Sequence, residues 1–505
     1  MFGVGFAAGH RPAARPPAPA RAPGYVPALS TPLHAAYGAQ RAIAGYAGPL
    51  FQLRRSSDGA LLDVSPQGGG DYPNYAALAR WAGAATLTVA ALYDQSGNGR
   101  HLTQPVAANQ PVFDLAVTEG GRVPISFDGY ARSTDAAPLN WRNKYLSGAV
   151  ALDRIAHTVL IAGIPINSQN SSGFAQLLNG GSSILGIVIS GLTMGTLAGA
   201  PRTSRTVWGY GKNATGNQWR ADGRTVFQSS GATGQAINQL VLGSSNVTAS
   251  AGQVGVYKMF AVAVYAAGLS AADGDNVANG LLTAIDATST YDYRLVWDGD
   301  SIQEGTGATQ LRSVPQLVQA RLAKRFDGFT TAVHGQQLAT IYANRAARFA
   351  PIFAAGRPNV IFLQAGINDI AAGTTGANLH NNSLGPLVSY LKGLGYRVIV
   401  STLLPFNGNA NWSAAKDAER AAYNALVVAN GAGAHQVLDI AQHPVMGAST
   451  APGDTTLYAD ALHPTALGYQ WLAGAPSGTF AGPYTYYAAL REALRGATGD
   501  ASFVP

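Results

Sequence analysis

Residue types that together perform nucleophilic catalysis occur in the C-terminal part of the sequence. Ser301 closes a Gly-Asp-Ser segment, and Asp460 stands three residues before His463. A serine hydroxyl becomes a strong nucleophile when a histidine takes its proton, and a carboxylate can hold that imidazole in the required tautomer. The amide of Asn368 is a group that can stabilise an oxyanion. The set predicts acyl transfer through a serine, provided that the fold brings these side chains together.

The surrounding elements predict that these residues meet at one edge of a sheet. From Tyr293 onward, apolar strand-like runs alternate with helical runs, which favours a parallel sheet with helices on both faces. Ligands bind beyond the carboxyl ends of the strands in such folds. Ser301 and Asn368 follow the first and third predicted strands, and His463 follows the last. The predicted strands are 294–297, 329–333, 359–364, 397–403 and 436–440, and the predicted helices are 314–325, 341–353, 384–394 and 414–429.

Four segments in this part of the chain resemble, in order, the sequence blocks of the SGNH (GDSL-type) hydrolases. They are Gly299-Asp300-Ser301, Val333-His334-Gly335-Gln336, Gly366-Ile367-Asn368-Asp369 and Asp460-Ala461-Leu462-His463-Pro464. The resemblance covers about residues 293–495. It implies a three-layer α/β/α fold with a parallel sheet, and ester hydrolysis through an acyl-serine intermediate.

The resemblance also implies a role for each matched residue. Ser301 would be the nucleophile, His463 the base and then the acid, and Asp460 the group that orients the imidazole. The oxyanion hole would consist of the backbone N–H groups of Ser301 and Gly335 together with the side chain of Asn368.

Each of these residues also fits a structural role. Ser301 is a common residue at a helix N-cap, and Asp460 is suited to capping the helix that follows it. Asn368 is typical of an Asx turn. His334 adjoins the proposed oxyanion glycine, so it either lines the substrate site or is a packed or solvated histidine.

The N-terminal part of the sequence follows a different rhythm, which predicts an all-β domain over residues 25–287. Short apolar runs alternate with Gly, Asn, Ser and Asp turns, as in a β-sandwich. Residues 268–287 read as a short closing helix. The predicted organisation is an arm at 1–24, the sandwich at 25–287, the esterase-like domain at 293–495 and a tail at 496–505.

Two segments of this sandwich, Tyr46–Gly59 and Leu92–Gln104, resemble the catalytic domain of family 54 α-L-arabinofuranosidases. The resemblance implies a concanavalin-A-like β-sandwich. The nucleophile of that family is a glutamate in the later part of the sandwich, but this chain has no glutamate between Glu119 and Glu304. We therefore interpret the N-terminal part as a sugar-binding or structural sandwich that has lost glycoside hydrolysis.

A polar loop in the second of these segments holds the predicted carbohydrate-binding residues. Asp94, Asn98 and Arg100 lie close together in a stretch rich in turn-forming residues. Their side chains suit the hydroxyl groups of a sugar. The same composition is equally typical of a turn that ties down the sandwich, and both interpretations remain open at this point.

The overall composition excludes several classes of function. Charged residues make up only 12% of the 505 residues and the net charge is +7, without a run of Lys or Arg, which argues against nucleic-acid binding. No stretch is apolar enough to predict a membrane span. The chain has no cysteine, and no metal-ligand spacing is present, so we predict neither a disulfide nor a metal nor a cofactor.

The N-terminus does not read as a Sec signal, because the arginines follow the short apolar run instead of preceding it. Residues 10–24 form a Pro/Ala/Arg segment that is expected to be extended. This arm is either a disordered tail or a segment that docks onto a phage-like particle. We predict an extracellular or virion-associated protein that has a polysaccharide or glycan as its partner. A homo-oligomer is compatible with the sequence.

The sequence therefore favours a serine esterase that acts on carbohydrate, as an O-deacetylase of an acetylated polysaccharide such as a capsule or O-antigen. The alternative is a phage-like spike or adhesin that binds cell-surface polysaccharide with an optional or lost esterase. A third possibility is residual arabinofuranosidase activity in the sandwich.

Overall fold

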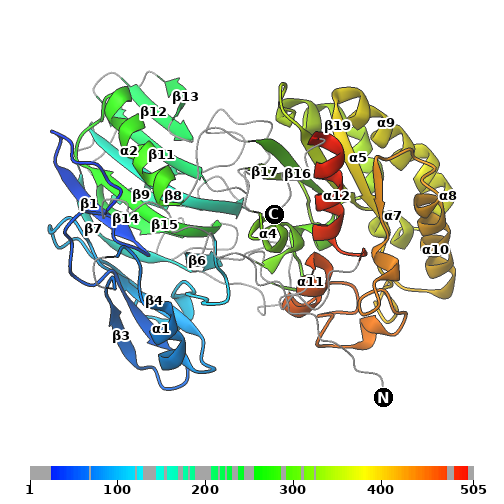
Figure 1. Cartoon of the computed structure of the whole chain (residues 1–505), viewed down its shortest axis with the longest axis horizontal. Coiled ribbons are helices and arrows are strands. Elements are labelled where there is room, and N and C mark those ends of the chain that lie inside the picture. The colour runs from blue at the N-terminus through cyan, green and yellow to red at the C-terminus, as the bar shows by residue number, and fades with distance from the viewer. Residues whose placement is uncertain are drawn as a thin grey trace, which may run out of the picture.

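The computed structural model describes most of the chain, in two parts that Figure 1 shows side by side: a β-rich part on the left and a mixed helical and parallel-sheet part on the right. The described residues are 24–67, 70–119, 122–128, 144–152, 156–168, 175–179, 182–187, 206–213, 216–221, 224–229, 237–243, 255–285, 292–308, 312–322, 326–474 and 483–498. No helix among them is long and apolar enough to span a bilayer.

Two antiparallel sheets make up the N-terminal part. The larger has the strand order β10-β9-β14-β7-β5-β4-β2-β3, and the other has the order β1-β15-β8-β11-β12-β13 with β6 also paired to β15. The first sheet consists of β2 (Phe51–Arg55), β3 (Leu61–Val64), β4 (Leu87–Leu92), β5 (Leu102–Thr103), β7 (Leu146–Leu152), β9 (Ala175–Asn179), β10 (Ser182–Ile187) and β14 (Ile237–Leu242). The second consists of β1 (Leu33–Gly38), β6 (Ile125–Asp128), β8 (His157–Ser168), β11 (Thr206–Asn213), β12 (Gly216–Ala221), β13 (Arg224–Ser229) and β15 (Gly255–Tyr265).

Alternation along the strands builds the core between the sheets. Phe51 and Leu92 of one sheet and Tyr257 of the other belong to one buried apolar cluster. Helix α2 (Ala271–Ala284) covers the other face of the second sheet through Val277 and Leu281. The predicted antiparallel sandwich and its closing helix are therefore confirmed, whereas the narrower assignment to the concanavalin-A-like class stays a prediction. Helix α1 (Tyr75–Ala82), between β3 and β4, was not predicted.

The C-terminal part contains a parallel sheet with the strand order β17-β16-β18-β19-β20. Its strands are β16 (Tyr293–Gly299), β17 (Phe326–Thr330), β18 (Asn359–Gln364), β19 (Tyr396–Ser401) and β20 (Gln436–Leu438). Strands β16 and β18 are buried along their whole length, which requires cover on both faces. The next strand in the chain, β17, pairs with one edge of β16, and the strand after it, β18, pairs with the other edge. The strand order therefore reverses at β16, and its carboxyl end is the topological switch point where ligands bind in such folds.

Helices cover both faces of this sheet, as the predicted α/β/α fold requires, and that prediction is confirmed. One apolar cluster holds Ile361 and Val398 against α9, and another holds Trp297 and Phe362 against α12. The helices are α3 (Ser301–Glu304), α4 (Val314–Gln319), α5 (Leu338–Ala343), α6 (Arg345–Phe349), α7 (Ile367–Ala371), α8 (Gly376–Leu379), α9 (Gly385–Leu394), α10 (Ala414–Val428), α11 (Ala466–Ala473) and α12 (Tyr486–Thr498).

Strand β17 begins three residues before the predicted start at 329. Its first residues include Asp327 and Gly328, which read as a turn. In the fold the Asp327 carboxylate pairs with Arg294 of β16 at 2.5 Å, and both side chains are buried. A charged residue is thus accommodated inside a strand by a partner that the local sequence does not reveal.

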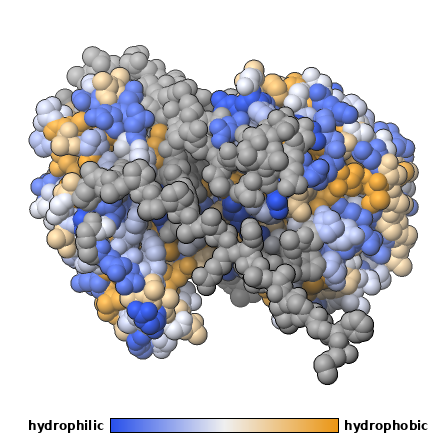
Figure 2. Space-filling view, viewed as in Figure 1, coloured by the Kyte–Doolittle hydropathy of each residue, from blue (hydrophilic) through white to orange (hydrophobic). Residues whose placement is uncertain are grey.

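The two parts of the chain are linked by at least one ion pair, between Arg312 before α4 and Asp114 in the loop that precedes β6. The described surface of the two parts is mixed in hydropathy. On the face that Figure 2 shows, hydrophilic and hydrophobic residues are interspersed over both parts. Such a surface agrees with the low content of charged residues.

Candidate functional site

The structure brings Ser301, His463 and Asp460 together in a hydrogen-bonded series. His463 Nε2 lies 2.8 Å from Ser301 Oγ, and His463 Nδ1 lies 2.7 Å from Asp460 Oδ2. Ser301 and His463 are 2% and 7% exposed, whereas the side chain of Asp460 is about half exposed, at 53%. A base in contact with the hydroxyl and a carboxylate on the other ring nitrogen is the arrangement that activates a serine.

Ser301 is placed by the sharp turn from β16 into α3. A Cβ atom on Gly299 would collide with the carbonyl oxygen of Gln364 in β18, so only glycine allows this close approach. Asp300 is the N-cap of α3, because its Oδ1 accepts the backbone N–H of Ile302 at 3.0 Å. Ser301 is therefore the first residue of the helix rather than its cap, and its hydroxyl remains available to His463.

A tight turn places His463. Asp460 Oδ1 accepts the backbone N–H groups of Leu462 and His463 at 3.2 and 2.8 Å, while Oδ2 contacts the imidazole. Ala461 takes a positive φ of 60°, a conformation that costs energy for a non-glycine residue. The following helix α11 is capped by Thr465, so Asp460 does not serve as its cap.

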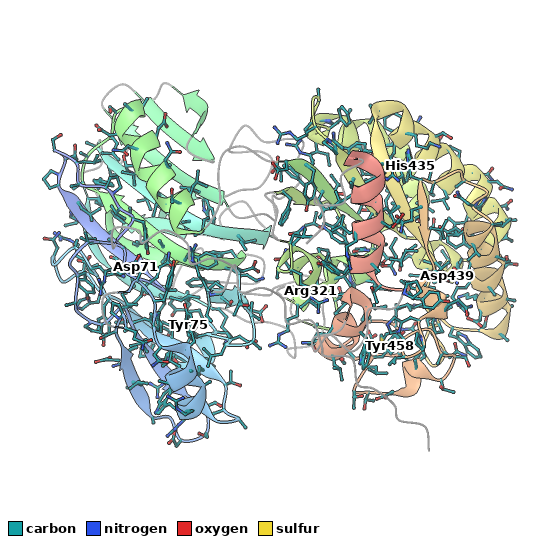
Figure 3. All side chains as sticks on the ribbon, in the orientation of Figure 1. Asp71, Tyr75, Arg321, His435, Asp439 and Tyr458 are labelled. Carbon is teal, nitrogen blue, oxygen red and sulfur yellow. The ribbon has the colours of Figure 1, made fainter. Side chains whose placement is uncertain are left out.

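Tyr458 anchors the start of this turn. Its backbone pairs with Pro464 in an isolated bridge, and its buried hydroxyl donates to the carbonyl of Met446 at 2.9 Å. Figure 3 labels Tyr458 below α11 in the C-terminal part. Because both ends of the turn are fixed, the imidazole of His463 is held on a rigid support.

Two of the proposed oxyanion residues, Gly335 in a loop and Asn368 in α7, lie on segments that are joined to each other and to β16. Val333 N–H donates to the carbonyl of Gly299 at 3.2 Å, and Asn368 Nδ2 donates to the carbonyl of Gln336 at 3.0 Å. Gly335 is exposed and has a φ of +68°, which favours glycine. The structure thus brings the loop of Gly335 and the start of α7, which carries Asn368, together beside the carboxyl end of β16. Their part in an oxyanion hole stays a prediction.

Two buried aspartates fix the loop that carries Gly335, one at residues that precede Gly335 and the other at residues that follow it. Asp298 accepts Thr331 Oγ1 at 2.5 Å and Arg348 Nε at 2.5 Å. Asp369 accepts the backbone N–H groups of Leu338 and Ala339 at 2.8 and 3.2 Å, at the N-terminus of α5. Asp369 therefore has a structural role, because it binds two backbone N–H groups of α5.

The pair of Asp298 and Arg348 was not predicted from the sequence. A carboxylate within a strand buried on both faces signals that some cation must reach it. Arg348 is 50 residues away in α6, so the sequence gives the need for a partner but not its identity.

Burial shifts the pKa of Asp300, the aspartate next to Ser301. Asp300 is fully buried, and this burial raises the pKa of its carboxyl to about 7, although the backbone N–H of Ile302 and the charge of His463 oppose the shift. Its Oδ2 atom has no hydrogen-bond partner among the described residues. Asp300 therefore exchanges a proton near neutral pH within one residue of Ser301.

The pKa of the Asp460 carboxyl is shifted in the opposite direction, to below its ordinary value. Partial burial acts to raise its pKa, but the hydrogen bond and charge of His463 and the backbone N–H groups of Leu462 and His463 outweigh burial and lower the pKa. Asp460 stays ionised at neutral pH, as a group that holds an imidazole and stabilises its cation must.

The ring of His334 lies beside the imidazole of His463, in a nearly parallel orientation. The centroids of the His334 and His463 rings are 6.0 Å apart, with 21° between their planes. His334 is exposed, and its Nδ1 lies 3.4 Å from Thr306 Oγ1. Of the two interpretations of this residue, its position favours lining the site.

The predicted carbohydrate-binding residues are engaged in holding a turn. Asp94 is buried and accepts the backbone N–H groups of Ala36, Ser96 and Arg100. The side chains of Asn98 and Arg100 both donate to the carbonyl of His34 at the start of β1. These contacts support the structural interpretation of all three residues. Among the described residues no group of three or more His, Asp or Glu side chains lies close enough together to hold a metal.

The matches to family models divide the chain as the two resemblances do, and both resemblances are confirmed. The GDSL-like lipase/acylhydrolase family model matches residues 299–471. The model for the catalytic part of α-L-arabinofuranosidase B matches residues 25–126. The first match contains every residue of the series from Ser301 to His463.

The chain is also similar to curated α-L-arabinofuranosidases over a short stretch. A probable α-L-arabinofuranosidase B of Aspergillus fumigatus is 44% identical over 75 residues, which is 15% of either chain. The α-L-arabinofuranosidase B of Aspergillus oryzae is 33% identical over 132 residues, or 25% of this chain and 26% of that protein. The chain thus spans about a sixth to a quarter of the length of these relatives.

Solved structures are similar to each part separately. A family 54 α-L-arabinofuranosidase matches with a TM-score of 0.41 and 15% identity, over 50% of this chain and 63% of that one. A G-D-S-L family lipolytic protein from Veillonella parvula matches with a TM-score of 0.29 and 19% identity, over 36% of this chain and 94% of that one.

Proposed function

We propose that this protein is a serine esterase that removes acyl groups, acetyl in the first place, from a carbohydrate polymer. The observation that carries the proposal is the series Ser301–His463–Asp460, with contacts of 2.8 and 2.7 Å at the carboxyl edge of a parallel sheet. The match of this region to the GDSL-like acylhydrolase model supports ester hydrolysis as the reaction class.

The geometry supports a two-step reaction. His463 Nε2 takes the proton of Ser301 Oγ as this oxygen attacks the ester carbonyl carbon. The tetrahedral oxyanion forms beside the loop of Gly335 and the side chain of Asn368, and its collapse expels the sugar oxygen, which receives the proton from His463. Water then attacks the acyl-serine, His463 takes a proton from that water, and the carboxylic acid leaves as Ser301 regains its proton.

The N-terminal part supports a carbohydrate as the carrier of the ester. Its family-model match and its curated relatives are α-L-arabinofuranosidases, which gives the esterase a neighbour of carbohydrate-active origin on the same chain. A surface with few charges also suits a neutral sugar polymer. The particular polymer, whether a capsule, an O-antigen or a plant polysaccharide, is the part of the proposal that only a substrate panel can decide.

The ion pair of Glu119 with Lys258 argues against glycoside hydrolysis by the sandwich. Retaining enzymes use two carboxyl groups about 5 Å apart. Glu119 is buried and paired with Lys258 Nζ at 2.6 Å, and no further glutamate follows before Glu304. We expect no release of arabinose from an aryl arabinofuranoside, and measurable release would restore the glycosidase interpretation.

The proposal of a phage-like spike rests on the sequence of the arm. Residues 1–23 lie outside the described residues, so docking to a particle, the extracellular or virion-associated location and a homo-oligomeric state stay predictions. Deletion of residues 1–24 should abolish attachment to the parent particle, and unchanged attachment would exclude the docking role.

The test of the esterase is the release of acetate from a panel of acetylated bacterial and plant polysaccharides. Wild type should release acetate from at least one polymer, and Ser301→Ala should release none. Ser313→Ala is a matched control, because Ser313 is a buried serine that precedes α4 and lies outside the series. Equal release by wild type and Ser301→Ala would overturn the proposal.

A further inference from the structure

A row of small and polar residues crosses five neighbouring strands of the larger N-terminal sheet. In the register of these strands, each member lies directly opposite the next. The members, which we call the polar row, are Asp63 of β3, Gln52 of β2, Ala91 of β4, Thr103 of β5 and Ser147 of β7. Directly opposed residues project from the same face of a sheet.

The polar row lies on the face of the sheet that is turned away from the core. Its strand neighbours Phe51, Leu92 and Leu102 belong to the core cluster, and side chains alternate between the two faces of a strand. Asp63 and Thr103 are exposed, Gln52 and Ser147 are partly exposed, and the small side chain of Ala91 at the centre is buried. The row therefore presents polar groups on both sides of a small central residue.

Two rings stand beside the polar row. Tyr93 continues β4 on the same face as Ala91, and its ring meets that of His101 edge to face, with centroids 5.1 Å apart. His101 is exposed and Tyr93 is partly exposed. The faces of sugar rings carry C–H groups that pack on aromatic side chains, whereas their edges carry hydroxyl groups that need hydrogen-bond partners.

The polar end of the row is already ordered. Asp63 Oδ1 accepts both Gln52 Nε2 at 2.9 Å and the Tyr93 hydroxyl at 2.7 Å. Partial burial and the bond to Asp63 raise the pKa of Tyr93 to about 12, so the phenol remains a donor at any physiological pH. An exposed carboxylate held by two donors has lost its side-chain freedom before a ligand arrives, and this lowers the entropic cost of binding.

We propose that the polar row, with Tyr93 and His101, is a binding site for a neutral polysaccharide chain. The carboxylate of Asp63 and the amide of Gln52 would bind sugar hydroxyl groups, and the rings would pack on a sugar face. An acidic polymer fits poorly, because its carboxylates would meet that of Asp63. The site adjoins the turn of Asp94, Asn98 and Arg100 without including these residues, because His101 Nδ1 accepts the backbone N–H of Asp94 at 3.0 Å. The inference rests on the proposed function in that the bound chain is the esterified polymer.

The test measures binding apart from catalysis. In the full chain with Ser301→Ala, affinities are measured by calorimetry for soluble acetylated xylan, for arabinan and for polygalacturonate as the acidic polymer. We expect at least one neutral polymer to bind and polygalacturonate to bind less. Asp63→Asn and Tyr93→Ala should each weaken binding by about tenfold. Asp273→Asn, on α2 outside the opposite sheet, is the matched control and should leave the affinity unchanged.

The outcomes separate this inference from the esterase proposal. Unchanged affinity in both variants, an equal loss in Asp273→Asn, or failure of the parent to bind any neutral polymer would overturn the polysaccharide site. Asp63→Asn and Tyr93→Ala should keep the near-UV circular dichroism and the denaturant midpoint of the parent, which shows that the sandwich is folded in both variants. Binding without any acetate release by wild type would leave the site standing and remove the esterase.

Discussion

Two polar loops were predicted as functional from the sequence, one in each part of the molecule. The hydrogen bonds of their aspartates differ. In the C-terminal part, the Asp460–His463 turn uses one carboxylate oxygen to order its own backbone and presents the other to an imidazole that reaches Ser301. In the N-terminal part, both carboxylate oxygens of Asp94 accept hydrogen bonds from backbone and side-chain donors of its own turn and of β1. Residue type is therefore a weaker guide to a site than the number of hydrogen-bonding positions that folding leaves open.

The largest effect is expected from removing the nucleophile. Ser301→Ala should lower kcat/KM for an acetyl ester by more than about a thousandfold, because acylation loses its attacking atom. His463→Ala should be similarly impaired, and the double variant should be no worse than either single one, since the two residues act as a unit. Steady-state kinetics on an aryl acetate measure all three. A double variant that is much slower than both would show that they act separately.

A smaller loss is expected at the orienting carboxylate. Asp460→Asn keeps acceptor and donor groups in the turn but removes the charge that stabilises the His463 cation, and kcat should fall by about a hundredfold. Water reaches the half-exposed Asp460 side chain and takes over part of its role, so the loss should stay below that of Ser301→Ala. Asp454→Asn, a turn aspartate of the preceding segment, is the control. A loss as large as that of Ser301→Ala would contradict this reasoning.

The oxyanion assignment predicts an effect on kcat rather than on KM. Asn368→Ala should lower kcat by about a hundredfold with KM nearly unchanged, because the donor acts on charge that develops in the transition state. The variant also loses the bond from Nδ2 to the carbonyl of Gln336. Asn368→Asp retains the size of the side chain without the amide donor, and should be impaired to a similar degree. A change confined to KM would assign Asn368 to substrate binding.

The parts of the fold that could be predicted are those whose cause is local. The turn from β16 into α3 and the Asp460–His463 turn are specified by a few adjacent residues, and the predicted series Ser301–His463–Asp460 follows from them. Pairs of distant residues were not predictable. Arg348 with Asp298, Lys258 with Glu119 and Arg294 with Asp327 depend on which elements become neighbours. The polar row likewise depends on strand register, which single strands do not encode.

The N-terminal loop should respond in stability rather than in binding. Asp94→Ala removes the acceptor of four hydrogen bonds from Ala36, Ser96 and Arg100, and leaves buried donors unpaired. We expect the free energy of unfolding of the sandwich to fall by about 2–3 kcal/mol, with an unchanged rate on an aryl acetate. Denaturant unfolding and esterase kinetics measure the two quantities. Loss of polysaccharide affinity at full stability would return Asp94 to the list of binding residues.

Asp300 is a second buried aspartate, and its carboxylate accepts fewer hydrogen bonds than that of Asp94. Burial raises the pKa of Asp300 to about 7 from an ordinary value of 3.8, and one of its oxygens has no partner among the described residues. Below both values the carboxyl is protonated in the folded and unfolded states, so it has no effect on stability there. Between them the unfolded chain releases the proton more readily, and this group lowers the stability as pH rises, by up to about 1.4 kcal/mol per pH unit.

Asp300→Asn should therefore flatten the fall in stability between about pH 4 and pH 7, while Ser301→Ala, which keeps Asp300, should retain it. Denaturant unfolding at intervals of one pH unit measures the difference between the two slopes. The asparagine also keeps an oxygen for the backbone N–H of Ile302, so the cap of α3 is preserved. Equal slopes in the two variants would mean that Asp300 is ionised in the folded state at pH 4, and that a donor reaches its second oxygen.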